Sequence, residues 1–258
     1  VLEKNIKVVS GPSLEKTGDL AAVLIGLEEG DILFIDEIHR LKINVEEYLY
    51  SAMEDFKIDV MIGNGGEQES LIINLQQFTL IGATTRTGNL SQPLRNRFTF
   101  SYKMDYYSNE ELSNIVFSIM NKNPEDYANH DLSINNNASL EIAKRSRGTP
   151  RLAINNLKMV RDYSFANDTI KITKNTVKKA LDFNGIKENG LTNEDQRYLD
   201  ILLSQNKPLG IKYISNLMGE DIQTIEDVIE PFLIQAGFVV KTPRGRIYNK
   251  NATKNLFN

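Results

Sequence analysis

Residues 31–38, DILFIDEI, are the stretch of sequence that decides the fold. Four apolar residues lead into two acids, Asp36 and Glu37, as in a buried parallel strand whose carboxyl end carries polar side chains. Apolar residues then recur at helical spacing from Val45 to Met53, so a helix should follow the strand. A strand followed by a helix is the unit from which α/β sheets are built.

Further strands are expected after this unit. Residues 58–63 and 70–75 are rich in β-branched residues and flank a glycine-bearing turn, which predicts a β-hairpin. Residues 78–83 form another short apolar run that ends at two threonines. Because strands and helices alternate, the sequence predicts an α/β domain over residues 1–105.

Residues 10–20, SGPSLEKTGDL, match a phosphate-binding loop only in part. Such a loop has the pattern Gly-x-x-x-x-Gly-Lys-[Ser/Thr], because its glycines let backbone N–H groups turn toward the phosphates. Glu15 stands where the second glycine should be, and its carboxylate would repel a triphosphate. The segment is therefore expected to be an ordinary loop.

Around Tyr106 the pattern changes, and up to residue 184 it contains helices alone. Ser108 and Glu111 match a capping box, in which each side chain bonds a free backbone N–H group at the start of a helix. Further helices are expected at residues 138–147, 150–165 and 175–181. The sequence therefore predicts a small helical domain over residues 106–184.

A third domain is expected over residues 185–258, beginning with a polar, glycine-bearing linker at residues 185–190. Pro231 should bend the third helix of this domain, because proline removes a hydrogen bond, and Gly237 should end it. Three helices and a hairpin form the winged-helix pattern. The expected helices cover residues 194–205, 211–218 and 222–236, and the strands cover residues 238–242 and 246–249.

Composition fits a cytosolic globular protein. The 258 residues are 41% hydrophobic and 25% charged, and they contain no cysteine. A chain without cysteine forms no disulfide, no cysteine-based zinc site and no thiol nucleophile. The sequence also has no apolar run of eighteen residues, so no membrane-spanning helix is expected.

Positive charge gathers at the C-terminal end, although the whole chain has a net charge of −4. Residues 238–258 contain no Asp or Glu, and their basic residues are Lys241, Arg244, Arg246, Lys250 and Lys254. Such a cluster suggests a nucleic-acid contact. A solvated terminus explains it equally well on charge alone, so both interpretations stay open.

The acidic pair matches a Walker B motif, in which the aspartate, Asp36, helps to hold Mg²⁺ and the glutamate, Glu37, polarises the attacking water. Two exposed acids after a buried strand are the plain alternative. His39 follows directly, and its one possible histidine partner, His130, lies in a polar segment. A histidine-based zinc site is therefore not expected.

Other residues could also meet a nucleotide. Thr84 and Thr85, at the end of a predicted strand, could place a hydroxyl beside a γ-phosphate, although threonine is also common in strands and at their ends. Arg95 or Arg97 could be an arginine finger that enters a neighbouring subunit, and a surface arginine paired with an acid is the alternative. Arg151 opens a helix after Gly-Thr-Pro and could reach a γ-phosphate of its own chain, although proline also suits a first helical turn.

The order of these motifs is that of an AAA+ ATPase, and in combination they resemble the RuvB family of Holliday-junction branch-migration ATPases. The matching segments are SGPSLEKTGDLAAVL, FIDEIHRL, AMEDFKIDVMIG, FTLIGATTR, PLRNRF, RSRGTPRLA, IEPFLIQAGF and TPRGR. The resemblance implies a P-loop AAA+ core of α/β class, present in part, with a helical lid and a C-terminal winged-helix domain. It also implies an ATP-dependent, Mg²⁺-dependent helicase that drives branch migration in recombination, DNA repair and the SOS response.

The resemblance assigns roles to individual residues around the nucleotide. Asp36 and Glu37 would be the Walker B pair, with Asp36 holding Mg²⁺ through water. Thr85 would be sensor 1, Arg97 the finger that acts in trans, and Arg151 sensor 2. Hydrolysis would then take place at the junctions between subunits of a homo-oligomer, a hexameric ring.

The resemblance also implies partners. Arg244 and Arg246 would lie in a wing that faces Holliday-junction DNA, the hairpin at residues 58–75 would dock RuvA, and RuvC would join the complex. Two departures from the family pattern affect these assignments. Asn96 replaces the usual aspartate between the two arginines, and the hairpin tip at residues 67–69 is acidic.

In this family the segment at residues 10–20 follows the phosphate loop, so the loop with its Walker A lysine would precede Val1. We therefore expect a partial chain, and weak or absent ATP hydrolysis by these 258 residues. Two other functions stay open: a winged-helix DNA-binding regulator on a non-hydrolysing ATPase remnant, and another AAA+ protein such as a clamp-loader subunit.

Overall fold

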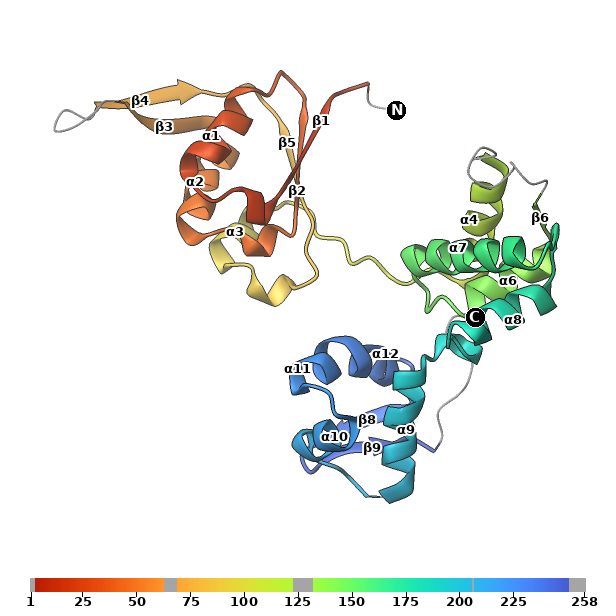
Figure 1. The fold of residues 1–258 in the computed structure, drawn as a ribbon. Helices are drawn as coiled ribbons and strands as arrows, with labels where there is room; N and C mark the ends of the chain where they lie inside the picture. The colour runs from red at the N-terminus through yellow and green to blue at the C-terminus, as the bar shows by residue number, and fades with distance from the viewer. Residues whose placement is uncertain (1–2, 63–68, 123–131, 206, 251–258) are drawn as a thin grey trace. The chain divides into compact units, whose positions relative to one another are not determined.

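The computed structural model describes residues 3–62, 69–122, 132–205 and 207–250. The chain forms two compact units, Val1–Lys103 and Met104–Asn258 (Figure 1). The first unit has one hydrophobic core, and the second has two, one in its helical part and one in its C-terminal part. Three separate cores therefore support the chain.

A three-stranded parallel sheet organises the first unit. The strands are β1 (Ile6–Ser10), β2 (Ile32–Asp36) and β5 (Thr79–Gly82), in the order β1-β2-β5. The helices are α1 (Thr17–Ile25), α2 (Ile43–Glu54) and the short α3 (Gln92–Arg97). Leu33 and Ile35 of β2 are fully buried in the core with residues of α1 and α2. The predicted unit of strand, acids and helix is therefore confirmed.

The opposite face of this sheet is apolar and exposed. Strand register places Val8, Phe34 and Ile81 side by side, and Ile6 lies two residues before Val8. The exposed fractions of Ile6, Val8 and Ile81 are 60%, 66% and 43%. We refer to Ile6, Val8, Phe34 and Ile81 as the apolar sheet face.

The predicted hairpin is present, and each strand lies one residue earlier than expected. Strand β3 (Lys57–Ile62) pairs antiparallel with β4 (Glu69–Asn74). Ile58 is buried at the base, whereas Leu71 and Ile72 are 49% and 63% exposed. The turn at residues 63–68, with most of the acidic tip, lies outside the described residues.

The expectation of an ordinary loop at residues 10–20 is wrong for part of that segment. Strand β1 ends at Ser10, a 3-10 turn η1 (Gly11–Ser13) follows, and α1 begins at Thr17. The carboxylate of Asp19 accepts hydrogen bonds from the backbone N–H groups of Glu15 and Lys16, at 3.1 and 2.9 Å. These bonds satisfy free donors at the start of α1.

The helical part of the second unit matches its predicted helices to within a few residues. The helices are α4 (Asn109–Lys122), α6 (Asn136–Lys144), α7 (Pro150–Ala166) and α8 (Lys174–Phe183). The capping box is confirmed, because Ser108 N donates to Glu111 Oε2 at 2.8 Å and Glu111 N donates to Ser108 Oγ at 3.2 Å. A short parallel pair, β6 (Ser133–Ile134) and β7 (Lys171–Ile172), was not predicted.

The C-terminal part is a winged helix. Its elements are α9 (Asn193–Gln205), α10 (Ile211–Met218), α11 (Ile222–Thr224), η5 (Ile225–Ile229), α12 (Glu230–Gln235), β8 (Val239–Thr242) and β9 (Gly245–Tyr248). The segment η5 is a π-helical turn, in which Glu230 N–H donates to the carbonyl of Ile225. The wider turn comes directly before Pro231, which has no N–H to donate. The chain then leaves the helix through Gly237 at φ +70°.

The predicted linker at residues 185–190 is fixed to both of its neighbours. Arg147, just before α7, donates from Nε to the carbonyl of Gly190 at 2.7 Å and forms an ion pair with the buried Asp195 of α9. Its guanidinium also lies 4.0 Å from the centre of the Phe232 ring. The helical part and the winged helix therefore share a charged, largely enclosed contact.

Candidate functional site

The acidic pair lies at the carboxyl end of β2. Asp36 is exposed, and its Oδ1 accepts a hydrogen bond from Glu37 N at 3.0 Å. Glu37 has a left-handed backbone with φ 50°. The next residue, Ile38, is 1% exposed and donates its N–H to the carbonyl of Ala83 after β5, at 2.9 Å. The turn is thereby fixed to two strand ends and presents both carboxylates at one edge of the sheet.

Glu37 is the centre of a polar cluster. His39 Nδ1 lies 3.2 Å from Glu37 Oε2 and 2.9 Å from Thr84 Oγ1. Thr85 Oγ1 donates to Glu37 Oε2 at 3.5 Å, the long limit of a hydrogen bond. Of the predicted residues, Glu37 and Thr85 are therefore brought together beside Asp36. His39 contacts Glu37 directly, a role that its position two residues later suggests and that sequence reasoning missed.

Gly11 explains why the segment at residues 10–13 lies at this site. A Cβ atom on Gly11 would lie 2.5 Å from the carbonyl oxygen of Glu37. Only glycine permits the turn η1 to approach the acidic turn this closely. The segment thus packs against the backbone of Asp36 and Glu37.

The oxygen atoms of this cluster suit Mg²⁺, which prefers hard oxygen ligands and usually binds through one or two carboxylates together with substrate phosphates. Asp36 supplies an exposed carboxylate and Thr85 a hydroxyl. Within the described ranges, no group of three His, Cys, Asp or Glu residues could hold a metal by itself. The donor set therefore fits a metal that is shared with a bound nucleotide.

The two arginines of α3 are both engaged within their own unit. The Nη2 atom of Arg97 forms an ion pair with Glu54 at 3.1 Å, and Nη1 donates to the carbonyl of Pro93 at 3.0 Å. The guanidinium also stacks on the Tyr50 ring, 4.1 Å from its centre. Arg95 donates to the carbonyl of Thr87. In this single chain, Arg97 is therefore an arginine paired with an acid.

Arg151 lies in the second unit, at the first turn of α7. It is exposed, and its side chain makes no hydrogen bond or ion pair with the residues that the structure describes. Its guanidinium is therefore available to an anionic ligand.

The two arginines of the wing have different surroundings. Arg246 in β9 forms ion pairs with Glu226 at 2.6 Å and with the fully buried Glu230 at 2.8 Å. Glu230 also accepts from Tyr198 Oη and pairs with Lys241 Nζ, both at 2.7 Å. Arg246 is thus held by ion pairs within the winged helix, and the DNA contact expected for it stays a prediction.

The hydrogen bonds of this network favour the charged form of Glu230. Burial raises the pKa of Glu230, but the hydrogen bonds from Arg246, Lys241 and Tyr198 outweigh burial and hold that pKa below its usual value. Burial, assisted by the Glu230 carboxylate, raises the pKa of Tyr198, so the phenol keeps its proton and donates. Arg244, in the turn between β8 and β9, is exposed and has no ion pair within the described part of the chain.

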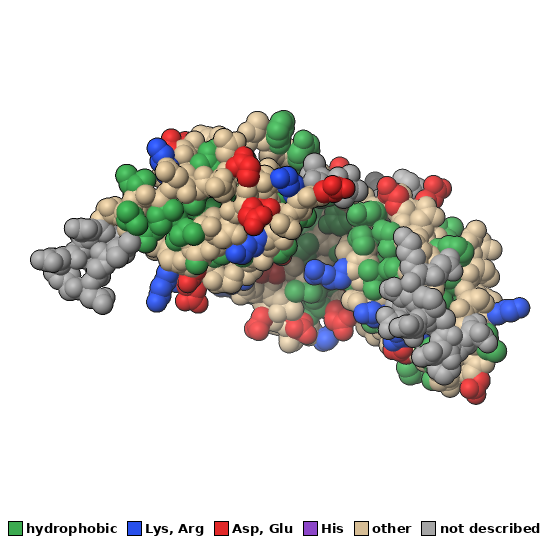
Figure 2. All heavy atoms as spheres, turned by 90° about the horizontal axis from the view of Figure 1, so that it is seen from above, with side chains coloured by type: hydrophobic (Ala, Val, Ile, Leu, Met, Phe, Trp, Pro, Cys, Tyr) green, Lys and Arg blue, Asp and Glu red, His purple; other side chains and the backbone are tan. Residues whose placement is uncertain are grey.

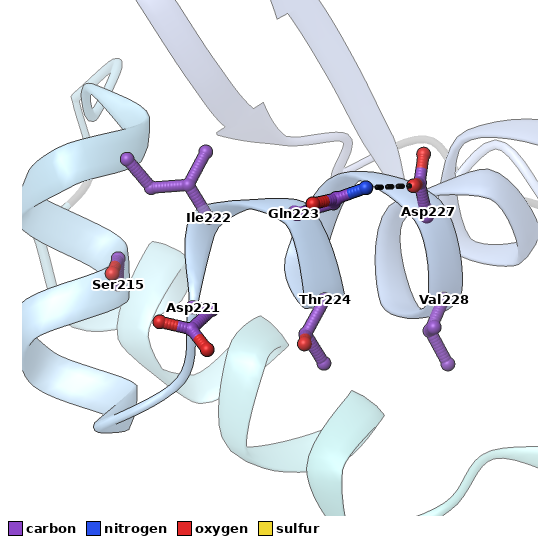
Figure 3. A pocket seen from close by; sticks show the side chains of 7 residues that line it. All are labelled: Ser215, Asp221, Ile222, Gln223, Thr224, Asp227 and Val228. Carbon is purple, nitrogen blue, oxygen red and sulfur yellow. Dashed lines mark hydrogen bonds between the residues drawn. The ribbon is translucent and has the colours of Figure 1, made fainter.

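In the winged helix, α11 and η5 border an open pocket of about 620 Å³ (Figure 3). The lining residues are Ser215, Asp221, Ile222, Gln223, Thr224, Asp227 and Val228. Gln223 Nε2 donates to Asp227 Oδ2 at 3.5 Å along this wall. The lining carries two carboxylates and no basic residue, so it disfavours DNA phosphates. A DNA contact is better served by the hairpin turn that carries Arg244.

On the side of the described residues that Figure 2 shows, acidic and basic side chains are interspersed. Within the described ranges, no helix has the length and apolar character needed to cross a lipid bilayer.

Three family models match consecutive parts of the chain. Residues 1–104 match the P-loop domain of the Holliday junction DNA helicase RuvB, residues 107–187 match the RuvB AAA lid domain, and residues 188–257 match the RuvB C-terminal winged helix domain. Their order is that of the predicted domains.

Two relatives are named Holliday junction branch migration complex subunit RuvB. The protein of a Nitratiruptor species is 49% identical over 247 residues, which are 95% of this chain and 72% of the relative. The protein of Fervidobacterium nodosum is 49% identical over 257 residues, which are 99% of this chain and 72% of the relative.

Solved structures agree. The Thermotoga maritima RuvB Holliday junction branch migration motor has 42% identity and a TM-score of 0.74, over 96% of this chain and 76% of that one. NtrX from Brucella abortus in complex with ATP has 13% identity and a TM-score of 0.53, over 89% and 58% of the two chains, which is a likeness of fold alone. On the combined strength of these matches, the chain belongs to the RuvB family.

Proposed function

We propose that the chain is an ATP-driven motor subunit that moves Holliday junctions in recombination and repair. The observation that carries the proposal is the convergence of Glu37 and Thr85 beside the exposed Asp36, in a domain that matches the RuvB P-loop domain. The match of all three domains to RuvB models removes the clamp-loader alternative.

Each residue of the cluster has a defined task in this proposal. Asp36 would hold Mg²⁺ through water, and the ion would shield charge on the triphosphate. Glu37 would polarise the attacking water, and Thr85 would orient that water or the γ-phosphate. Arg151 would contact the γ-phosphate from the same chain. Arg97 would complete the site of a neighbouring subunit.

A finger that acts in trans requires a ring, and we propose a hexamer. RuvA would dock on the β3–β4 hairpin, where the exposed Leu71 and Ile72 supply an apolar surface, and RuvC would join the junction complex. Arg244 would contact the DNA backbone from the wing. A motor of this kind would act on DNA in the bacterial cytoplasm, as part of the SOS response.

We further propose that these 258 residues alone hydrolyse ATP weakly or not at all. The sequence contains no Gly-x-x-x-x-Gly-Lys-[Ser/Thr] segment. The backbone cradle of such a loop holds the phosphates in place for attack.

Branch migration of a synthetic four-way junction tests the function directly. The full-length gene product, with RuvA, ATP and Mg²⁺, should move the junction, and Glu37→Gln should lower kcat for ATP by about 10²- to 10⁴-fold while ATP binding persists. Glu47→Gln, an exposed position on α2, is the matched control and should behave as wild type. Normal turnover by Glu37→Gln would exclude this active site.

A further inference from the structure

One face of α2 is built around Arg97. Glu46, Tyr50 and Glu54 are spaced four residues apart, so their side chains follow one another along the same side of the helix. That side meets α3. Glu46 and Tyr50 contact Ser91, the residue that caps α3, and Tyr50 and Glu54 contact Arg97.

The Tyr50 ring is fixed before it meets the arginine. Its hydroxyl donates to Glu46 Oε1 and lies 3.1 Å from Ser91 Oγ. Burial raises the pKa of Tyr50 and the bond to Glu46 raises it further, so the hydroxyl keeps its proton and the bond persists. Ser91 Oγ in turn accepts from Leu94 N at 3.1 Å. The ring and the start of α3 are therefore one unit.

The guanidinium of Arg97 has three distinct contacts and one buried nitrogen atom that bonds none of the described residues. Tyr50 covers its plane, Glu54 pairs with Nη2, and Pro93 accepts from Nη1. The Nε atom is buried and has no hydrogen-bond partner among the residues that the structure describes. Asn96, between the two arginines, bonds Gln92 at 2.7 Å. The orientation of Arg97 is thus set by α2 and by the α3 backbone.

We propose that Tyr50 and Glu54 are positioning residues for the arginine finger. The ring of Tyr50 fixes the plane of the guanidinium. Glu54 binds the Nη2 atom until the triphosphate of a neighbouring subunit replaces it as the ion-pair partner. Glu54 is 55% exposed, so its ion pair is weak and can be exchanged, whereas the ring contact can persist during transfer. A finger that is oriented in advance needs no rearrangement in the transition state. The inference rests on the proposed role of Arg97.

Steady-state ATP hydrolysis by the full-length gene product tests the proposal. Tyr50→Leu removes the ring and should lower kcat at least about tenfold with the KM for ATP unchanged. Tyr50→Phe keeps the ring and should stay within about threefold of wild type. Glu54→Gln should lower kcat by about two- to fivefold, and Glu47→Gln on the same helix should not change it.

A second measurement reports the contact without hydrolysis. In nuclear magnetic resonance spectra, the side-chain protons of Arg97 should be shifted upfield by the ring, and this shift should vanish in Tyr50→Leu and persist in Tyr50→Phe. Wild-type kcat in Tyr50→Leu would overturn the proposal, as would an equal loss in Tyr50→Phe. If Tyr50→Leu does not fold, an unchanged kcat in Glu54→Gln overturns it.

Arg97→Ala separates this inference from the proposed function. If Arg97→Ala abolishes turnover and Tyr50→Leu leaves it intact, the positioning role alone is wrong. Normal turnover in Arg97→Ala would remove the trans role itself, and the positioning role with it.

Discussion

Arg244 and Arg246 of the wing share a sequence context and differ in their electrostatic surroundings. Arg244 is exposed in the hairpin turn, whereas Arg246 is bound by Glu226 and by the buried Glu230. Glu230 lies sixteen residues before Arg246 in the sequence. No local sequence pattern indicates that Glu230 is this partner. The basic wing could therefore be predicted from the sequence, but which of its arginines is bound within the fold could not.

The two arginines should therefore respond differently to alanine substitution. Arg246→Ala leaves the buried carboxylate of Glu230 with Lys241 as its remaining cation, and should cost about 3 kcal/mol of stability. Arg244→Ala should change the free energy of unfolding by less than about 0.5 kcal/mol. It should also make the slope of log K for DNA binding against log salt concentration shallower by about 1. Urea denaturation and binding titrations at several salt concentrations measure both quantities. Equal destabilisation by the two variants would contradict this assignment.

The lowered pKa of Glu230 predicts a loss of stability in acid. A carboxyl whose folded pKa is lowered stabilises the fold fully above its unfolded pKa of about 4.5, and that contribution is lost as pH falls through the folded pKa. The urea midpoint of the unit that contains the winged helix should thus be steady from pH 7 to 5 and decrease below about pH 4.5. Glu230→Gln removes the titrating group and should flatten this decline. If the urea midpoints of the wild type and of Glu230→Gln decrease in parallel as the pH falls, Glu230 is not the source of the loss of stability.

At the scale of elements, hydrophobic periodicity decided what could be predicted. The helix at residues 211–218 has a clear apolar stripe and was predicted with its observed bounds. Strand β1 was not predicted, although its sequence IKVVS contains three β-branched apolar residues. Strands β6 and β7 were not predicted because each has two residues, too few to show an alternating pattern. The acidic pair of the site was predicted from its strand. The contact between His39 and Thr84 was not, because it joins residues 45 positions apart.

Glycine substitutions test how tightly the wing hairpin is packed. Gly245 has φ +130°, and a Cβ atom there would overlap the backbone carbonyl of Leu209, whose N–H and C=O both pair with Arg246. Gly237 has φ +70° and open space around it. Gly237→Ala should therefore cost about 1 kcal/mol for its backbone conformation alone, and Gly245→Ala about 1–3 kcal/mol more. Urea unfolding of the two variants measures both losses of stability. Equal losses would show that the backbone at Leu209 moves to accommodate the added Cβ atom without an energetic cost.

At the scale of the molecule, Arg147 joins two of the three cores. It bonds Gly190, pairs with the buried Asp195 and stacks on Phe232 of the winged helix. Because Arg147 contacts both parts, we expect the unit from residue 104 to 258 to unfold as a whole, although it contains two cores.

Calorimetry should show this coupling. The wild-type unit should unfold in one transition, and Arg147→Ala should cost about 3–5 kcal/mol at the junction and separate the two cores into two transitions. Arg161→Ala, which affects an ion pair with the adjacent Asp162, is the control and should shift stability by less than about 1 kcal/mol. A single unshifted transition in Arg147→Ala would show that the cores are joined elsewhere.

The apolar sheet face has a consequence for the behaviour of the purified chain. Ile6, Val8 and Ile81 are exposed on a sheet whose outer strands, β1 and β5, pair on one side only among the described residues. Apolar strands with unpaired backbone N–H and C=O groups tend to associate with one another in solution. Light scattering should therefore detect clustering that grows with protein concentration. Val8→Lys places a charge on β1, an outer strand of this surface, and should keep the particles small. An unchanged particle size would mean that association does not take place through these strands.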